Sequence, residues 1–591
     1  MAETLISPGV FIQENDLSQI TQGPVEAGAA LIGPTVTGPV NIPTLVTSYS
    51  DYKSKFGGSF ISGGSSYEYL TSIAALNYFE QGGSSILVTR VASGSYTAAT
   101  ASIVAADNTT SFTLETLSTG VVMNNWGDGP TTGSNGALLS GSISNIRWEV
   151  TGVNSGSGVF SLVIRRGDDY NTSKTILETW NNLSLDPNQN NYIGYVIGDQ
   201  TQTAVLDSTG DYYLQVTGSY ENKSRYVRVS SVSKPTPNYF DQSGLPQNQF
   251  TSSLPKLGSG SAQGSFSTAA GAIYGVFGSS ALNMFEAIPI NAATTPAYNI
   301  QGLIANGAST SNYYIAINLL ENKDAYKFNV IYAPGLTSQN ASGEVSDILN
   351  LAQNRGDSIA VIDMVGYGQS IGTPISRAVS YDNSYGATYW PWVQIRSRET
   401  GKINFVPAST IVPAVYEYND KVSAEWFAPA GLNRGALSTV LRPERRLTVN
   451  DRNLLYQGKV NPIATFPGVG TVIYGQKTLQ QKPSALDRVN VRRLLIALKS
   501  YIGQIGETLV FEPNTQVTRN KFLNQVNPYL ESVQQRQGLY AFQVVMDETN
   551  NTPDVVDRNQ LVGTIYLQPT KTAEFIQLDF NILPTGTTFG Q

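Results

Sequence analysis

The chain has 591 residues, carries a formal net charge of −7 at pH 7, and contains neither cysteine nor histidine. The absence of cysteine excludes disulfides, thiolate metal sites and thiol nucleophiles. The absence of histidine excludes Ser-His-Asp catalysis and histidine metal ligands. The composition therefore argues against an enzyme, and we expect no cofactor and no metal site. A chain of this length corresponds to roughly three to four domains.

The first segment, residues 1–22, is predicted to be an extended arm. Ser7-Pro8-Gly9 prevents a helix from starting, and a short strand follows it. The start of the chain has neither the basic nor the apolar region of a signal peptide, and no run of about 18 apolar residues exists, so we expect neither secretion nor a membrane-spanning helix. The residues of this arm strand are Val10, Phe11, Ile12, Gln13 and Glu14.

Residues 23–95 and 266–400 are predicted to form one discontinuous α/β domain, because apolar strands alternate there with helices of helical periodicity. Residues 96–265 differ: they are rich in Ser, Thr, Gly and Asn and carry short alternating runs, which predicts an inserted β-rich outer domain. The expected elements of the α/β domain are helices at Tyr67–Gln81 and Gly343–Gln353 and strands at Ile86–Val91, Lys327–Tyr332 and Ser358–Val365.

Residues 401–569 are predicted to form a C-terminal inner domain, followed by an arm strand within residues 570–591. In this arm Ile576, Leu578 and Phe580 share one face of a strand, and Phe575, Gln577 and Asp579 lie on the other. An exposed strand edge is an aggregation hazard, so we expect it to pair with another copy of the chain. The inner domain is expected to hold helices at Val440–Tyr456 and Arg488–Ile502 and strands at Leu509–Phe511, Ala541–Met546 and Leu561–Leu567.

A glycine-rich turn, Gly366–Gly372, follows a buried strand and leaves an α/β enzyme open as an alternative. Its GxGxxxG spacing differs from that of a dinucleotide loop, and a tight turn explains it as well. Such an enzyme would use carboxylate or nucleotide chemistry in the 327–372 region, where Asp357 and Asp363 are the nearest carboxylates.

The helix around Arg488–Lys499 combines an apolar stripe with four cations, in a C-terminal third that is mildly basic beside an acidic remainder. One interpretation is a core helix with a solvated face. The other is a basic helix that docks on an acidic partner surface. The candidate docking residues are Arg488, Arg492, Arg493 and Lys499.

Several segments together resemble the tail sheath protein family of contractile-tailed bacteriophages. The resemblance is specific over about 420–591 and the first 95 residues, looser over 266–420 and absent over 96–265. Lys477 departs from the resemblance, because the family often has arginine at this position. Lysine cannot make the bidentate contact that arginine makes, so any such contact inferred there is weakened. The segments that carry it are Ser7–Val10, Ala428–Gly435, Val460–Ile463, Val472–Leu479, Asp487–Lys499, Phe511–Asn514 and Asn550–Phe580.

The resemblance implies a multidomain α+β / α/β fold with an α/β core, an inserted β-rich domain and extended N- and C-terminal arms. It implies a structural subunit that polymerises as stacked hexameric rings around an inner tube and contracts to drive the tube through the host cell envelope. The implied partners are the sheath polymer itself, the inner tail tube protein, and baseplate and tail terminator proteins, with no nucleic acid and no membrane insertion. The implied location is the virion tail, after assembly in the host cytoplasm.

The arm strands would then add to a neighbour's sheet, with hinges at Gln19–Gly28 and Gln568–Thr572, and the four cations would dock on the tube. Two further alternatives remain besides the enzyme. One is the sheath of a related injection machine, an R-type tailocin or an extracellular contractile injection system. The other is a β-rich fibre, spike or capsid protein, which the predicted helices disfavour.

Overall fold

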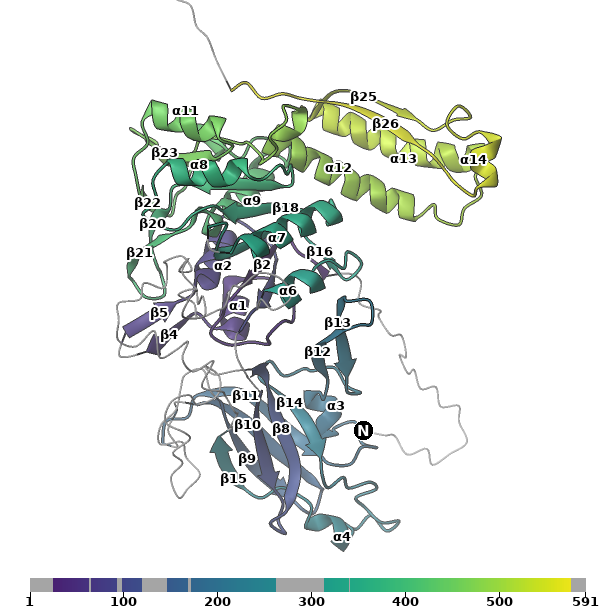
Figure 1. Cartoon of the computed structure of the whole chain (residues 1–591). Coiled ribbons are helices and arrows are strands. Elements are labelled where there is room, and N and C mark those ends of the chain that lie inside the picture. The colour runs from purple at the N-terminus through teal and green to yellow at the C-terminus, as the bar shows by residue number, and fades with distance from the viewer. Residues whose placement is uncertain are drawn as a thin grey trace, which may run out of the picture.

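A computed structural model describes residues 25–62, 65–92, 98–119, 146–167, 169, 172–261, 313–339 and 341–574. In Figure 1 an α/β body lies at the centre, a β-rich unit below it, and a C-terminal unit of long helices and a hairpin extends sideways from its top. The body has a hydrophobic core on each face of its sheet, and the other two units have one core each. Within these residues, no helix is both long and apolar enough to cross a membrane.

The body is built on an eight-stranded sheet whose central strands are parallel and whose two edge strands are antiparallel to their neighbours. The middle strands are buried along their whole length, as expected for a parallel sheet covered on both faces. From edge to edge the strands are β24 (Gly470–Ile473), β23 (Asn461–Phe466), β19 (Gly386–Trp390), β18 (Ile359–Asp363), β17 (Val330–Thr337), β2 (Ala29–Gly33), β6 (Ile86–Arg90) and β3 (Thr44–Val46).

Helices cover both faces of this sheet and give the body three layers. The predicted helices at Tyr67–Gln81 and Gly343–Gln353 are confirmed, as α2 and α7. One face carries α1 (Tyr49–Phe56), α2 (Leu70–Glu80) and α9 (Val412–Val422). The other carries α6 (Tyr314–Leu319), α7 (Ser342–Arg355), α8 (Gly372–Val379) and α11 (Val449–Gln457).

The β-rich unit interrupts this sheet in sequence but not in space, because β2 and β17 pair although the unit lies between them in the chain. It packs two sheets around one apolar core, and a separate hairpin reaches back to α6 of the body. One sheet has β11 (Ile176–Ser184), β10 (Val159–Arg166), β9 (Ile146–Asn154) and β15 (Gly258–Ser261). The other has β14 (Val227–Val232), β8 (Thr110–Thr119) and β7 (Ala98–Val104), and the hairpin is β12 (Thr201–Leu206) with β13 (Tyr212–Thr217).

The C-terminal unit packs two long helices against a β-hairpin. Each helix buries one apolar side, and the hairpin contributes Leu539 and its partly buried neighbours to the same core. Its elements are α12 (Val489–Glu507), α13 (Gln516–Gln535), β25 (Leu539–Val545), α14 (Pro553–Asp557) and β26 (Thr564–Pro569).

Two predicted elements are wrong. The helix expected at Val440–Tyr456 is a short strand, β22 (Val440–Pro443), and then α11, because Pro443 breaks the pattern and a capping box at Thr448 starts the helix anew. The strand expected at Leu509–Phe511 is the turn between α12 and α13, with Phe511 at φ +70°. The three apolar residues there do not pair with another strand in the described structure.

Candidate functional site: an open hairpin and the root of the C-terminal arm

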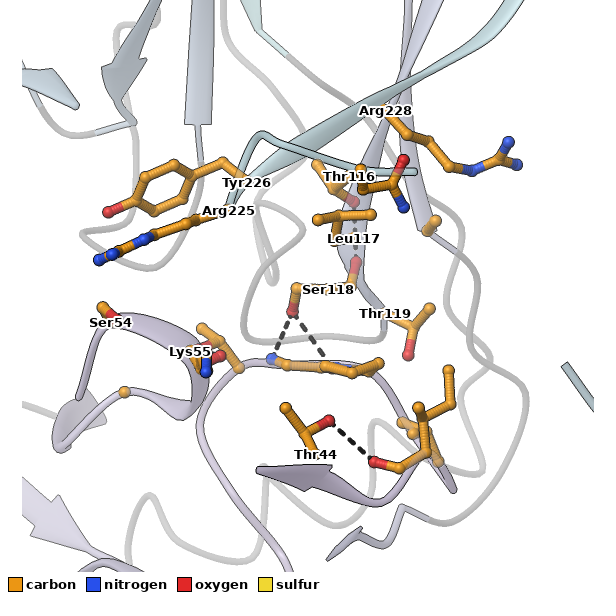
Figure 2. Close-up of a pocket in the computed structure, with 18 of the residues that line it drawn as sticks. Thr44, Ser54, Lys55, Thr116, Leu117, Ser118, Thr119, Arg225, Tyr226 and Arg228 are labelled. Atoms are coloured by element: carbon orange, nitrogen blue, oxygen red, sulfur yellow. Dashed lines mark hydrogen bonds between the residues drawn. The ribbon is translucent and has the colours of Figure 1, made fainter. Parts of the chain in front are cut away.

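A cavity of about 1230 Å³ lies between the α/β body and the β-rich unit. Several of the charged groups that line it form ion pairs within the chain: Lys53 with Glu399 at 2.9 Å, Lys55 with Asp51 at 2.9 Å, and Arg228 with Glu115 at 2.8 Å. Figure 2 shows Ser118 reaching across from β8 to the body, where its Oγ accepts a hydrogen bond from the Gly38 N–H at 2.7 Å. The cavity is therefore the junction of two units. The Ser118–Gly38 hydrogen bond crosses this junction, whereas each ion pair lies within one unit.

The glycine-rich turn does not offer a phosphate site. The Gly368 N–H, which would point at a phosphate, donates instead to the carboxylate of Glu444 at 2.6 Å. The two candidate carboxylates serve structure: Asp357 pairs with Arg355 at 2.7 Å, and buried Asp363 accepts from the Ser409 N–H at 3.1 Å and hydroxyl at 2.5 Å. Burial raises the pKa of Asp363 to about 7. Among the described residues, no cluster of three or more acidic side chains could hold a metal ion.

Two of the four predicted docking residues on α12 lie inside the subunit. Arg493 is 3% exposed and pairs with Asp420 through both terminal nitrogens, one of them at 2.9 Å. Arg492 is 4% exposed, stacks over the Tyr385 ring at 4.0 Å and donates to Ser384 Oγ at 2.5 Å. The expectation that these guanidinium groups are available to a partner is therefore corrected: their charge is used to join α12 to the body.

The other two docking candidates are more accessible. Lys499 is exposed, with its Nζ 3.3 Å from the hydroxyl of Tyr385. Arg488 has a quarter of its side chain exposed and is bonded to Glu574 and Asp487. A docking role for this helix stays a prediction, and within this subunit it would act through Lys499 first.

The hairpin β25–β26 is a sheet of two strands whose outer edges pair with no third strand in the described part of the chain. Tyr540 and Tyr566 are each 59% exposed on these strands. A two-stranded hairpin is marginally stable by itself, so such a sheet is suited to accept further strands on its open edges. The two arm strands that could fill them, Val10–Glu14 and Phe575–Phe580, lie outside the described residues.

At the root of the C-terminal arm, the carboxylate of Glu574 gathers most of the hydrogen bonds to the rest of the subunit. Arg488 donates to both of its oxygens, from Nε at 2.7 Å and from Nη2 at 3.0 Å. The hydroxyl of Tyr456 donates at 2.8 Å and Nε2 of Gln476 at 3.1 Å. We call these four residues the Glu574 clamp. Burial opposes the charge of Glu574, but the three donors outweigh it and hold its pKa below the usual value.

Sequence reasoning missed this clamp. Glu574 stands 86 residues from Arg488 and 118 from Tyr456 in the chain, and only the fold brings them together. In the sequence Glu574 is one position of an alternating segment, and nothing in that pattern marks it as partly buried.

Comparison with known family models gives a consistent result over the later part of the body and the C-terminal unit. Residues 306–479 match the family model described as the phage tail sheath protein central domain, and residues 481–582 match the phage tail sheath C-terminal domain. The tail sheath protein of Vibrio phage KVP40 is 32% identical over 320 residues, which are 50% of this chain and 48% of that protein. The tail sheath protein of Enterobacteria phage T4 is 36% identical over 239 residues, 37% of this chain and 36% of that protein.

These alignments span about half the length of the Vibrio phage protein and about a third of the T4 protein. Among solved structures, the sheath complex of an extracellular contractile injection system in its contracted state matches 43% of this chain and 71% of that chain. The identity of this match is 25% and its TM-score is 0.37.

Proposed function

Since this chain belongs to the phage tail sheath protein family, we propose that it is the subunit of a contractile sheath that forms stacked hexameric rings around an inner tube. The family is a structural one, so the role is mechanical rather than enzymatic. The observation that carries the proposal within this structure is the hairpin β25–β26 with its two open edges.

The proposed joint between subunits is strand addition. The arm strands of neighbouring copies, Val10–Glu14 and Phe575–Phe580, extend the two-stranded sheet of β25 and β26 on its free edges. Each backbone hydrogen bond contributes roughly 0.5–1.5 kcal/mol net, so a strand that makes about four of them contributes about 2–6 kcal/mol before its side chains are counted. Because main-chain bonds do not depend on side-chain detail, such a joint survives a rotation of the attached bodies.

The proposed contraction draws on the free-energy difference between two packings of the same subunits. The extended packing is metastable, and the contracted one is more stable. The bodies move past one another while the donated strands keep the subunits linked, and the tube is driven through the host cell envelope. In this proposal the subunit resides in the virion tail, having assembled in the host cytoplasm with tube, baseplate and terminator proteins.

The experiment is arm deletion. Full-length protein should form striated hollow cylinders in negative-stain electron microscopy, whereas chains lacking residues 1–18 or 575–591 should stay folded and monomeric. A matched control keeps the length of the chain and removes only the apolar face of the C-terminal arm strand, by changing Ile576, Leu578 and Phe580 to serine. Regular cylinders from either truncated chain would refute the strand-addition joint.

Tube docking is a separate part of the proposal. Lys499 is the exposed cation of α12, so Lys499→Glu should weaken attachment of the inner tube while sheath cylinders still form. Co-sedimentation of cylinders with the tube measures it, and unchanged tube binding would remove α12 from the docking surface. The alternative that this is the sheath of a related injection machine predicts the same joints, and differs only in what the tube delivers.

A further inference from the structure

We propose that Glu574 is a positioning residue, whose carboxylate fixes the point and direction from which the C-terminal arm leaves the subunit. The inference deepens the proposed function and rests on it in one respect, the assignment of the arm to a neighbouring subunit. The clamp itself is a property of the single chain.

The chain after β26 returns to the body instead of leaving the subunit at the hairpin. Figure 1 shows this yellow segment running back from β26 toward the top of the body. Its first contact is with the hairpin, where the Thr570 N–H donates to the Gly538 carbonyl at 3.1 Å. Its next contacts are with the body, where Nε2 of Gln476 donates to Thr572 Oγ1 at 2.6 Å and to Glu574. Glu574 is thus the last fixed point described before the arm strand.

The receiving side of the clamp is built for a carboxylate. Its donors come from three separate places: Tyr456 from α11, Gln476 from the loop after β24, and Arg488 from the start of α12. A bidentate arginine–carboxylate pair is geometrically specific and stronger than a neutral hydrogen bond.

The positive charges around the clamp outnumber the negative ones, and Glu574 reduces the excess from two charges to one. Lys477 lies over the Tyr456 ring at 4.3 Å, and Lys459 lies 3.7 Å from Asp487. Burial, together with the charges of Lys459 and Arg488, lowers the pKa of Lys477. Asp487 pairs with Arg488 at 2.7 Å and is the other carboxylate in this group. A second carboxylate, that of Glu574, relieves the repulsion among the three cations.

Two consequences follow for the lattice. The stretch Gln568–Thr572, the expected hinge, is held in place by β26 and by the contacts of Thr570 and Thr572. A pull on the arm during contraction loads the Glu574 clamp, where the body meets the start of α12, before it loads the hairpin β25–β26. The hairpin is thereby left free to hold a neighbour's strand while its own arm is under tension.

The absence of cysteine from the chain makes a direct test possible. A single cysteine introduced by Ala573→Cys carries a nitroxide spin label next to the clamp on the soluble, full-length subunit. We expect an immobilised electron paramagnetic resonance spectrum, which becomes mobile when Glu574→Ala is added. Arg488→Lys should give an intermediate spectrum, because it keeps the charge and loses one of the two bonds. The matched control is Glu512→Ala, an exposed glutamate of the α12–α13 turn, which should leave the spectrum unchanged.

Assembly separates this inference from the proposed function. Glu574→Ala keeps the arm, so cylinders should still form, with a critical concentration raised about tenfold because the arm is no longer pre-oriented. Equal label mobility with and without Glu574→Ala overturns the clamp, whatever the truncated chains do. Regular cylinders from the chain lacking 575–591, together with a mobile label in Glu574→Ala, refute the arm joint and leave the clamp standing.

Discussion

Replacing Arg493 by alanine is expected to open the junction between α12 and the α/β body, and not merely to remove a surface charge. The guanidinium is buried, pairs with Asp420 and lies 4.7 Å from the centre of the Tyr416 ring. It also faces the carboxylates of Glu417 and Glu425, whose ionised forms it stabilises. Without it, the three acidic groups stand close together with their main counter-charge removed.

The size of the destabilisation depends on how much water can reach the acidic groups that remain. Removing one partner of a buried ion pair costs about 3–5 kcal/mol, because the other charge is left uncompensated. The Asp420 side chain is 17% exposed, so it regains part of its hydration, which places the cost near the lower end, at about 3 kcal/mol. That value corresponds to roughly a hundredfold shift in the equilibrium for local opening. Burial already raises the pKa of Glu417 to about 7, and loss of Arg493 should raise it further.

Hydrogen exchange read by mass spectrometry measures this on the full-length soluble subunit, since a multidomain chain has no single unfolding equilibrium. Peptides from α9 and α12 should exchange about a hundredfold faster in Arg493→Ala, and peptides from the β-rich unit should not change. Adding Asp420→Asn should restore part of the protection, because it removes the orphaned charge. The matched control is Lys499→Ala on the same helix, expected within about 0.5 kcal/mol of the parent. If α12 peptides exchange as slowly in Arg493→Ala as in Lys499→Ala, the buried Arg493–Asp420 pair is not what holds this junction.

Three further outcomes are expected. The pKa of Glu574 is held below its usual value. As pH falls, the clamp should therefore persist to the ordinary pKa of glutamate and release only when pH passes the lowered pKa. A spin label beside the clamp that is already mobile between pH 5 and 7 would contradict this. Burial raises the pKa of Glu68 to about 7. Between the ordinary glutamate pKa and this raised value, the native state holds a proton that the unfolded chain has lost. The stability of the α2 region should therefore fall as pH rises through this range. Glu68→Gln should flatten that dependence, which thermal melts between pH 5 and 8 would show. Gly386→Ala should cost about 1–3 kcal/mol, because the new Cβ would lie 2.3 Å from a Leu349 methyl, whereas Gly372→Ala meets nothing within 4 Å and should melt like the parent.

The sequence was sufficient where a segment had one strong period and clear ends. α2 and α7 fall where the pattern predicts helices, and the buried run at Ser358–Val365 contains β18. The sequence failed where local chemistry outweighed the pattern, as at Thr448, whose capping box starts α11 partway along the predicted helix. It also missed α13, a helix rich in Asn and Gln with Pro528 inside it, because its apolar stripe is narrow.

The candidate site was less accessible to sequence reasoning, for a physical reason. Periodicity places Arg492 and Arg493 on α12, but whether a cation faces solvent depends on partners that the fold supplies from elsewhere. Asp420 lies 73 residues before Arg493, and Ser384 lies 108 before Arg492. Alternation likewise marks the arm as a strand and identifies its two faces, but the carboxylate that anchors it is indistinguishable from any other surface glutamate.

In the proposed sheath, each subunit donates a strand at one place and accepts a neighbour's strand at another, and this determines the kind of lattice. A strand leaves from the Glu574 clamp on the body, and a neighbour's strand arrives at the hairpin β25–β26. Contacts of this kind are heterologous: they close into rings or continue as helices, and they do not stop at dimers. Because the C-terminal unit and the clamp beside it carry the joints, the body and the β-rich unit are free to change their packing. A sheath that must shorten without breaking needs this separation between what links its subunits and what moves.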